Sequence, residues 1–356
     1  MKIAFNIVPL ESAHKERGIG YYTKNLLECL KKDPDLEIIE FTNLVDIKKD
    51  VDCVHFSWFD LYFHTLPLNT HFPTVVTIHD VIPLIFKEHY PVGMRGKINF
   101  ILQKFTLNRC KKIITDSLVS KTDIVKYLKI NESKITIIPL ASDPAFKVLN
   151  ESKLLLVKRK YNLPDRFLLY VGDANFVKNL PFLIDCFNDL VKLPDFVDLK
   201  LVLVGGVFLK NVENIDHPEL LSLKKVLMMI KDYGLESKVL RPGRLDLDDL
   251  VAFYNLAALY VQPSLYEGFG LPILQALACG APVLSSNKGA LLEVGGNAAL
   301  YFDPGNKTQF NSLVVETLQN KSLRSKLSKL GLIQAAKFSW EKTAQETKLV
   351  YAKIKS

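Results

Sequence analysis

A carboxylate directly precedes a glycine-rich turn in the second half of the chain, in the segment Glu267-Gly268-Phe269-Gly270-Leu271-Pro272. The apolar run 258–262 before this turn is typical of a buried strand, and the run 273–278 after it is typical of a helix. A helix that begins in this way presents free backbone N–H groups and the positive end of its dipole to an anion. A phosphate at the amides of 269–271, beside a carboxylate that accepts hydrogen bonds from hydroxyls, describes a sugar-nucleotide site. An ordinary strand-to-helix turn also uses glycine, and the glycines alone do not separate the two interpretations.

A lysine is expected at the same edge of the second sheet. Gly172 follows the predicted strand Phe167–Val171, and Lys178-Asn179 begins the next predicted helix. Because ligands of open α/β sheets bind beyond the carboxyl ends of the strands, Lys178 could neutralise a diphosphate there. Taken alone, Lys178 is also typical of a solvated lysine in a first helical turn.

Two polar motifs occupy comparable positions in the first half of the chain. The loop Arg17-Gly18-Ile19-Gly20 follows the first predicted strand and opens a helix. Thr23 replaces the third glycine of a dinucleotide-binding fingerprint, so the loop gives a dehydrogenase little support, and both a phosphate contact and a bare turn fit it. His79-Asp80 ends the fourth predicted strand, where ligands of α/β folds bind, although a histidine there is commonly a hydrogen-bonded structural residue.

The elements that must position these groups alternate between strand-like and helical patterns along the whole chain, which is the signature of α/β proteins with doubly wound parallel sheets. The predicted strands are Ile3–Val8, Glu37–Thr42, Cys53–Phe56, Thr74–Ile78, Lys112–Thr115 and Lys134–Pro139, then Phe167–Val171, Leu199–Val204, Val239–Leu240, Ala258–Gln262, Pro282–Ser285 and Ala299–Phe302. At 356 residues the chain is too long for one typical domain. We predict two Rossmann-like domains, 1–160 and 161–338, joined by a polar linker at 150–165, and a final helix, 339–356, that packs back on the first domain.

The chain carries a net charge of +8 and a pI of about 9.0, which favours acidic partners. Between Lys87 and Lys112 seven cations accompany a single acid, Glu88, and six apolar residues are interleaved with them from Ile98 to Leu107. This pattern is compatible with a basic amphipathic helix on an anionic membrane. A solvated helix whose apolar residues pack on the sheet explains it as well, and we favour that interpretation slightly.

The remaining composition indicates a folded protein of the cytoplasm. No apolar run approaches the roughly 20 residues of a membrane span, and the N-terminus leads into a strand without the features of a secretory signal. Five scattered cysteines without a CxxC pair indicate reduced thiols. The basic and apolar pattern of residues 87–112 leaves open that the protein attaches peripherally to the inner face of the cell membrane. The DxD triplets at 33–35, 50–52 and 246–248 look accidental, so we predict no metal, no cofactor and no nucleic-acid partner.

Together these motifs resemble family 4 retaining glycosyltransferases of the GT-B fold. The resemblance covers nearly the whole chain, is most specific in the second domain, and is carried by Arg17-Gly-Ile-Gly20, His79-Asp80, Gly172, Lys178-Asn179, Pro263–Pro272, Ala276–Gly280 and Ser339-Trp340. It implies two Rossmann-like domains that face a cleft, a nucleotide-sugar donor held mainly by the second domain, an acceptor held mainly by the first, and no required metal.

The resemblance also implies roles for individual residues. Glu267 would bind hydroxyls of the donor sugar, the amides of Phe269, Gly270 and Leu271 would hold sugar and phosphate, and Lys178 would contact the diphosphate. The loop Gly18-Ile19-Gly20 would close on the diphosphate from the first domain, and His79 would touch the sugar near the reacting carbon. The neighbouring binding residues would be Asp80, Gly172, Asn179, Gly268 and Arg241, the last in a loop 241–244 near the base.

Two positions depart from the family pattern. Gln275 stands where a second glutamate usually contacts the ribose, and Asp173 follows Gly172 where many members carry an arginine. A neutral amide forms weaker hydrogen bonds than a carboxylate, and an acid near a diphosphate is unfavourable unless it points away.

We therefore predict a retaining, metal-independent hexosyltransferase that moves a mannose- or glucose-type sugar from a nucleoside diphosphate to a glycan or polyprenyl-linked glycan. The alternative is a nucleotide-sugar-binding protein without transferase activity, which Gln275 and Asp173 prompt. A GT-B epimerase or phosphorylase ranks last, because nothing in the sequence resembles a pyridoxal phosphate lysine site.

Overall fold

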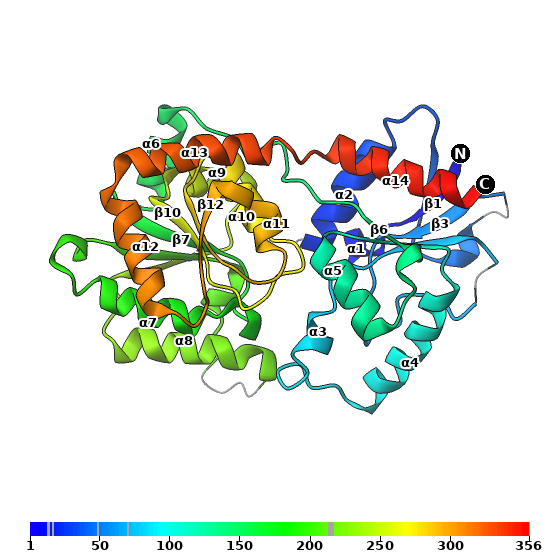
Figure 1. Ribbon diagram of the computed structural model, residues 1–356, viewed down its shortest axis with the longest axis horizontal. Helices are drawn as coiled ribbons and strands as arrows, with labels where there is room; N and C mark the ends of the chain where they lie inside the picture. Colours follow the sequence, from blue (N-terminus) through cyan, green and yellow to red (C-terminus); the bar gives the residue numbers. More distant parts are fainter. Residues whose placement is uncertain (13–14, 16–17, 48–49, 70, 213–216, 356) are drawn as a thin grey trace. The chain divides into compact units, whose positions relative to one another are not determined.

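The structure of the protein is a computed structural model that describes residues 1–12, 15, 18–47, 50–69, 71–212 and 217–355 (Figure 1). Arg17 of the first glycine loop lies outside the described residues. The chain forms two compact units, which we call the first unit, Met1–Ala141 with Phe338–Ser356, and the second unit, Ser142–Lys337.

The first unit is built on a six-stranded parallel sheet with the order β2-β1-β3-β4-β5-β6. Its strands are β1 (Lys2–Asn6), β2 (Glu37–Phe41), β3 (Cys53–Phe56), β4 (Thr74–Thr77), β5 (Lys112–Thr115) and β6 (Ile135–Ile137). Most strand residues are buried, as expected for a parallel sheet covered on both faces. The strand order reverses between β1 and β3, and groups that follow β1 therefore lie at a topological switch point.

The helices of the first unit include the C-terminal helix of the chain. They are α1 (Val8–Glu11), α2 (Gly18–Leu30), α3 (Ile82–Ile85), α4 (Met94–Arg109), α5 (Leu118–Asp123), the π-helical segment η2 (Ile124–Leu128) and α14 (Trp340–Lys355). In Figure 1, α14 lies beside α2. Polar contacts fix it there: the Tyr351 hydroxyl is 2.7 Å from His55 Nδ1 on β3, and the Thr343 hydroxyl donates to the Pro139 carbonyl at 2.8 Å.

The second unit contains a second six-stranded parallel sheet, with the order β12-β11-β10-β7-β8-β9. Its strands are β7 (Phe167–Val171), β8 (Lys200–Val204), β9 (Val239–Gly243), β10 (Leu259–Gln262), β11 (Val283–Ser286) and β12 (Ala299–Phe302). The main helices are α6 (Glu151–Lys160), α7 (Leu180–Leu190), α8 (Leu221–Asp232), α9 (Leu247–Leu256), α10 (Leu271–Ala278), α11 (Leu291–Gly295), α12 (Lys307–Gln319) and α13 (Lys321–Ala335). Here the strand order reverses between β7 and β10, which are adjacent and parallel. The switch point of this sheet therefore lies between the loops that follow β7 and β10.

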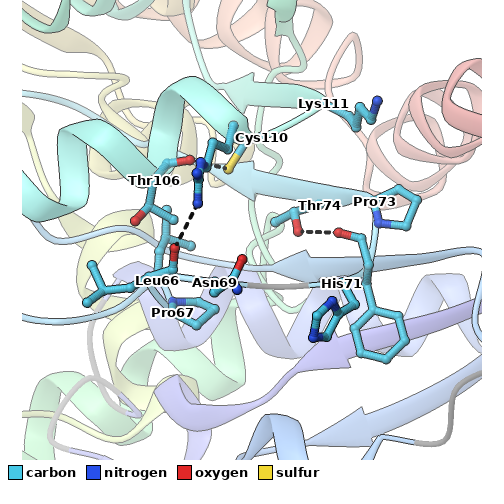
Figure 2. Close-up of a pocket in the computed structure, with 12 residues that line it drawn as sticks. Leu66, Pro67, Asn69, His71, Pro73, Thr74, Thr106, Cys110 and Lys111 are labelled. Atoms are coloured by element: carbon cyan, nitrogen blue, oxygen red, sulfur yellow. Dashed lines mark hydrogen bonds between the residues drawn. The ribbon is translucent and has the colours of Figure 1, made fainter.

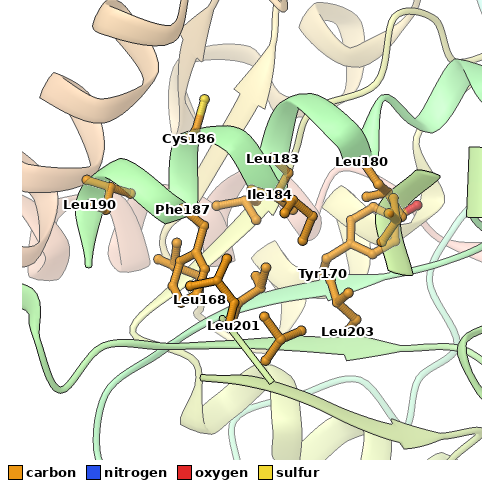
Figure 3. Close-up of a cluster of buried hydrophobic side chains, with 14 of the residues drawn as sticks. Leu168, Tyr170, Leu180, Leu183, Ile184, Cys186, Phe187, Leu190, Leu201 and Leu203 are labelled. Atoms are coloured by element: carbon orange, nitrogen blue, oxygen red, sulfur yellow. The ribbon is translucent and has the colours of Figure 1, made fainter. Parts of the chain in front are cut away.

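An apolar cluster holds α7 against β7 and β8 (Figure 3). Leu183, Ile184 and Phe187 lie on the inner side of α7 and are fully buried above Leu168 and Leu201 of the strands. Side chains two apart on a strand share one face, and side chains three or four apart on a helix share one side. This packing fixes the start of α7, and with it the loop that carries Lys178.

The segment that the sequence assigned to a linker, 150–165, is largely helical, which corrects that expectation. It contains α6, which belongs to the second unit. Asn150 caps the helix by accepting a hydrogen bond from the Lys153 amide at 3.1 Å, and three cations lie in its last turn, where they complement the dipole. Asp249 on α9 holds the end of α6 through Lys160 and Tyr161. The polar composition that suggested a linker is that of a capped surface helix.

Candidate active site

Lys178 and Glu267 meet at the switch point of the second sheet. Lys178 ends the short 3-10 helix η4 (Phe176–Lys178) in the loop after β7, and Glu267 lies in the loop after β10. The Lys178 ammonium donates to both carboxylate oxygens of Glu267, at 2.8 and 2.9 Å. Their side chains are 19% and 10% exposed, so this is a largely buried ion pair. An ammonium has three donors, and a carboxylate that takes two of them leaves one for a further anion.

Two neutral side chains complete the set of donors around the Glu267 carboxylate. Gln262 Nε2 donates to Glu267 Oε1 at 2.8 Å, and the Ser264 hydroxyl donates to the same oxygen at 2.6 Å. Sequence reasoning missed both residues. A signal was present for Gln262, since a polar residue that ends an apolar strand must find partners in the fold. These contacts hold the carboxylate in one orientation.

The glycine turn after Glu267 forms as the sequence predicted. Gly270 precedes the first residue of α10 with a φ of 110°, and a Cβ on it would lie 2.8 Å from a Leu291 methyl group. A second glycine, Gly289, packs directly on the turn: its φ is 60°, and a Cβ there would lie 2.4 Å from the Glu267 carbonyl oxygen. The following amide, of Ala290, donates to that oxygen at 3.0 Å. Only glycine fits both positions.

The residues around Lys178 mainly shape its loop. Asn179 has a φ of 55°, and its side-chain amide donates to the carbonyls of Pro263 and Pro304 at 3.1 and 3.0 Å, which ties together the loops after β7, β10 and β12. The Gly172 amide donates to the Val204 carbonyl at the end of the neighbouring strand. Asp173 is exposed, and its carboxylate accepts from the Ala174 amide at 2.7 Å. Asn179 is therefore a positioning residue for the loop.

Gln275 lies on α10, as predicted, and is buried. Its side-chain oxygen accepts a hydrogen bond from the Tyr254 hydroxyl at 3.1 Å. Arg241 differs from the expectation, because β9 continues to Gly243 and Arg241 is a residue of this edge strand, not of a following loop. It is exposed and donates to the Phe208 carbonyl at 3.4 Å.

In the first unit, His79 pairs with a buried carboxylate that the sequence did not single out. His79 follows β4 and Asp116 follows the adjacent β5, and His79 Nδ1 lies 2.7 Å from Asp116 Oδ2. Burial disfavours the imidazolium, but the Asp116 carboxylate outweighs it and raises the pKa of His79. His79 Nε2 is buried and has no hydrogen-bond partner among the residues that the structure describes. The pair thus leaves one oriented ring nitrogen for a ligand group.

The first glycine motif lies close to this histidine. Gly18, Ile19 and Gly20 form the first turn of α2, and Tyr22 on the same helix packs edge-on against the His79 ring, with the centroids 4.7 Å apart. Asp80 accepts a hydrogen bond from the Ile82 amide at 3.0 Å, at the start of α3. The motifs 18–20 and 79–80 therefore share the carboxyl edge of the first sheet.

The aspartate triplets have structural partners. Lys348 on α14 binds Asp33 and Asp35, Lys2 contacts Asp50, and Asp246 caps α9. Within the described part of the chain, no three His, Cys, Asp or Glu side chains are grouped so that they could hold a metal ion. No helix formed by the described residues has the length and apolar character to cross a membrane.

Comparisons with known proteins identify the family. The model of the family Glycosyl transferases group 1 matches residues 156–350, and that of Glycosyltransferase Family 4 matches residues 16–146. The serotype-specific mannosyltransferase WbdA of Escherichia coli is 33% identical over 290 residues, which are 80% of this chain and 34% of WbdA. The O-antigen chain mannosyltransferase B of Escherichia coli is 29% identical over 277 residues, 77% of this chain and 68% of that protein. This chain thus spans about a third of the length of WbdA.

Among solved structures, HepE from Anabaena in complex with UDP and glucose superposes with a TM-score of 0.75. The sequences are 16% identical, and the alignment covers 99% of this chain and 100% of that one, so the likeness shows the fold. Two parallel sheets with flanking helices, each with polar groups at its carboxyl edge, define the GT-B class. The chain belongs to the group 1 glycosyltransferases, that is, to glycosyltransferase family 4.

Proposed function

We propose that this chain is a metal-independent, retaining hexosyltransferase. It takes a mannose- or glucose-type sugar from a nucleoside diphosphate and transfers it to a hydroxyl of a glycan or lipid-linked glycan. The observation that carries the proposal is the Lys178–Glu267 pair at the switch point of the second sheet, next to the glycine turn that starts α10. The mannosyltransferase names of WbdA and of mannosyltransferase B support a mannose donor, and the UDP and glucose in the HepE complex support a nucleoside diphosphate.

The chemistry follows from where charge develops. When the bond between sugar and phosphate breaks, positive charge builds on the sugar ring and negative charge on the leaving phosphate. The Lys178 ammonium and the amides at the start of α10 stabilise that phosphate. Because the fold already holds these groups in position, no free energy is needed to reorganise them during the reaction. The leaving phosphate oxygen takes the proton of the acceptor hydroxyl on the same face, which yields retention.

Glu267 and His79 would act on the sugar. Because Lys178, Gln262 and Ser264 fix the Glu267 carboxylate, the remaining lone pair of its Oε2 has a set direction for a sugar hydroxyl. His79 carries its proton on the nitrogen that faces Asp116, so Nε2 can accept a hydrogen bond from a hydroxyl or, when protonated, donate one.

Incubation with labelled GDP-mannose or UDP-glucose and a mannose-containing polyprenyl-linked oligosaccharide tests the proposal. We expect nucleoside diphosphate to be released in step with extension of the acceptor, with the anomeric configuration of the donor kept in the product as measured by NMR. Saturable binding of the nucleotide sugar without transfer, over a panel of acceptors, would favour a nucleotide-sugar-binding protein. A product of inverted configuration would refute the retaining step.

A further inference from the structure

The helix α4 presents a continuous apolar stripe to solvent. Met94, Ile98, Ile101 and Phe105 are 73%, 52%, 67% and 54% exposed. Their spacing of four, three and four residues places them within an arc of about 60° at 100° per residue. A helix on the surface of a globular protein normally turns such a stripe toward the core.

The opposite side of α4 faces the core of the first unit, where Leu107 is fully buried, and polar side chains fix it there by hydrogen bonds. Gln103 is fully buried: its side-chain oxygen accepts from the amides of Thr65 and Leu66, and its side-chain amide donates to the Leu66 carbonyl, all at 2.9 to 3.0 Å. Asn99 donates to the Tyr62 carbonyl at 2.9 Å. From the sequence, a helix whose apolar residues pack on the sheet was slightly favoured. The structure corrects this for Ile98, Ile101 and Phe105, because the polar contacts to residues 57–69 hold the other side of α4 inward. Leu107 and Phe100 do pack against the core of the first unit.

Cations line both sides of the apolar stripe. Lys97 and Lys104 flank it on one side, and Arg95 and Arg109 flank it on the other, by the same helical geometry. The Arg109 guanidinium lies 4.4 Å from the centroid of the Phe105 ring. Among the described residues none of these four cations forms an ion pair with a carboxylate, and α4 contains no acidic residue.

The loop residues 57–69 extend the same surface. Its Phe63 and Leu68 are 71% and 43% exposed, and Arg109 donates to the Leu68 carbonyl. A pocket of about 260 Å³ shares Leu68 and Arg109 with this surface and has Lys111 at its margin (Figure 2). The pocket lies at the amino ends of β4 and β5, because Thr74 and Lys111 line it, whereas His79 follows the carboxyl end of β4. It is therefore distinct from the candidate active site.

We propose that α4 and the loop residues 57–69 form a docking surface for an anionic lipid bilayer. The apolar stripe enters the boundary between headgroups and acyl chains, and the flanking lysines and arginines bind lipid phosphates with their aliphatic stems along the stripe. The positive charge of this surface favours a lipid bilayer over a second copy of the chain. A second copy of the chain would bring unpaired cations against unpaired cations, which is unfavourable, whereas an anionic surface neutralises all of them. The proposal does not depend on the proposed function.

Vesicle binding tests this surface. We expect the full chain to bind vesicles that contain phosphatidylglycerol roughly tenfold more strongly, or better, than vesicles of phosphatidylcholine alone, as measured by sedimentation. The binding should weaken when salt is raised from about 50 to about 500 mM, because the screening length is roughly 10 Å at 0.1 M and shorter at higher salt. Ile98→Ser/Ile101→Ser and Lys97→Gln/Lys104→Gln should each weaken binding on the order of tenfold.

Matched control variants carry the same types of substitution on α13 and α14. Ile333→Ser/Leu349→Ser removes apolar side chains that are 63% and 61% exposed, and Lys326→Gln/Lys329→Gln removes exposed lysines of α13. Both should bind vesicles within twofold of the unchanged protein. Equal binding to both vesicle types, or unchanged binding of the α4 variants, would overturn the proposal. So would a dimer in solution that Ile98→Ser/Ile101→Ser dissociates without any vesicle binding.

Discussion

Replacing Glu267 by glutamine removes the charge of the central carboxylate and keeps its shape. In the native site, one carboxylate oxygen accepts from Lys178, Gln262 and Ser264, and the other accepts from Lys178 alone. Glutamine keeps one acceptor oxygen and places an amide donor at the other position. A donor would then face the Lys178 ammonium, and at least one hydrogen bond of the site is lost.

The expected loss of stability is modest. One hydrogen bond to a charged group contributes about 1.5 to 3 kcal/mol, and the remaining donors can turn to solvent or to the amide oxygen. Unfolding free energies of native proteins are about 5 to 15 kcal/mol, so Glu267→Gln should remain folded. Alanine is a poorer probe, because it would leave Lys178, Gln262 and Ser264 all without their acceptor.

The expected loss of activity is comparable in free energy to the loss of stability. Removing one group that stabilises developing charge lowers turnover about a hundredfold or more, which is about 2.7 kcal/mol in activation free energy. Lys178→Met should lose a similar factor. Because the two side chains form one pair, the double variant should lose less than the product of the two factors, with a coupling of about 0.5 to 3 kcal/mol.

The assay is a set of initial rates at saturating donor for the four proteins of this cycle, with urea unfolding curves beside them. Asp185→Asn is the matched control, since it breaks another lysine–carboxylate pair of the second unit, between Asp185 and Lys307 at 2.8 Å. Its turnover should stay within twofold. Normal turnover of a folded Glu267→Gln, or losses that multiply without coupling, would refute the reasoning for this pair.

The remaining predictions concern the ribose contact, the metal and acid stability. Gln275→Glu should tighten donor binding by on the order of 1 kcal/mol with little change in turnover, because a carboxylate binds a ribose hydroxyl more strongly than an amide does; calorimetry that shows weaker binding would contradict the role. Activity should survive EDTA, and a loss that magnesium or manganese restores would overturn the metal-independent mechanism. Burial lowers the pKa of His55 to about 3, whereas an unfolded histidine titrates near 6.5. Between pH 6.5 and about 3 the unfolded state binds a proton at His55 and the folded state does not. The free energy of unfolding therefore falls as the pH falls from about 6.5 toward 3, by about 2 kcal/mol between pH 7 and 5. His55→Gln should remove this part of the pH dependence in urea unfolding curves, and an unchanged slope would show that His55 is not its source.

The parts of the site that depend on neighbours in the chain could be predicted from the sequence. The strand, glycine turn and helix around Gly270 are encoded within about twenty residues, and the order of strands and helices follows from local hydrophobic periodicity. The residues Lys178 and Glu267 could be placed at one sheet edge, because strands of a parallel sheet end on the same side. Their direct ion pair could not be predicted, because the two residues are 89 positions apart in the chain and the pair depends on the directions of their side chains.

Gln262 and Ser264 are close to Glu267 in the chain, but the other contacts that were missed join residues far apart in the sequence. Asp116 is 37 residues from His79, and nothing in its local sequence marks it as a partner. Gly289 is set by its packing against the backbone of Glu267, which glycine spacing does not reveal. The exposure of Ile98, Ile101 and Phe105 on α4 was mispredicted because an apolar stripe normally marks the buried side of a helix, whereas Gln103 anchors the other side here.

A crystal structure of the full chain with a bound nucleoside diphosphate sugar tests the central claim most directly. We predict that the diphosphate lies within hydrogen-bonding distance of Lys178 Nζ and the Leu271 amide, with a sugar hydroxyl donating to the Glu267 carboxylate. A nucleotide sugar bound with its diphosphate away from Lys178, for example at Arg109 and Lys111 in the first unit, would contradict the assignment of the donor site.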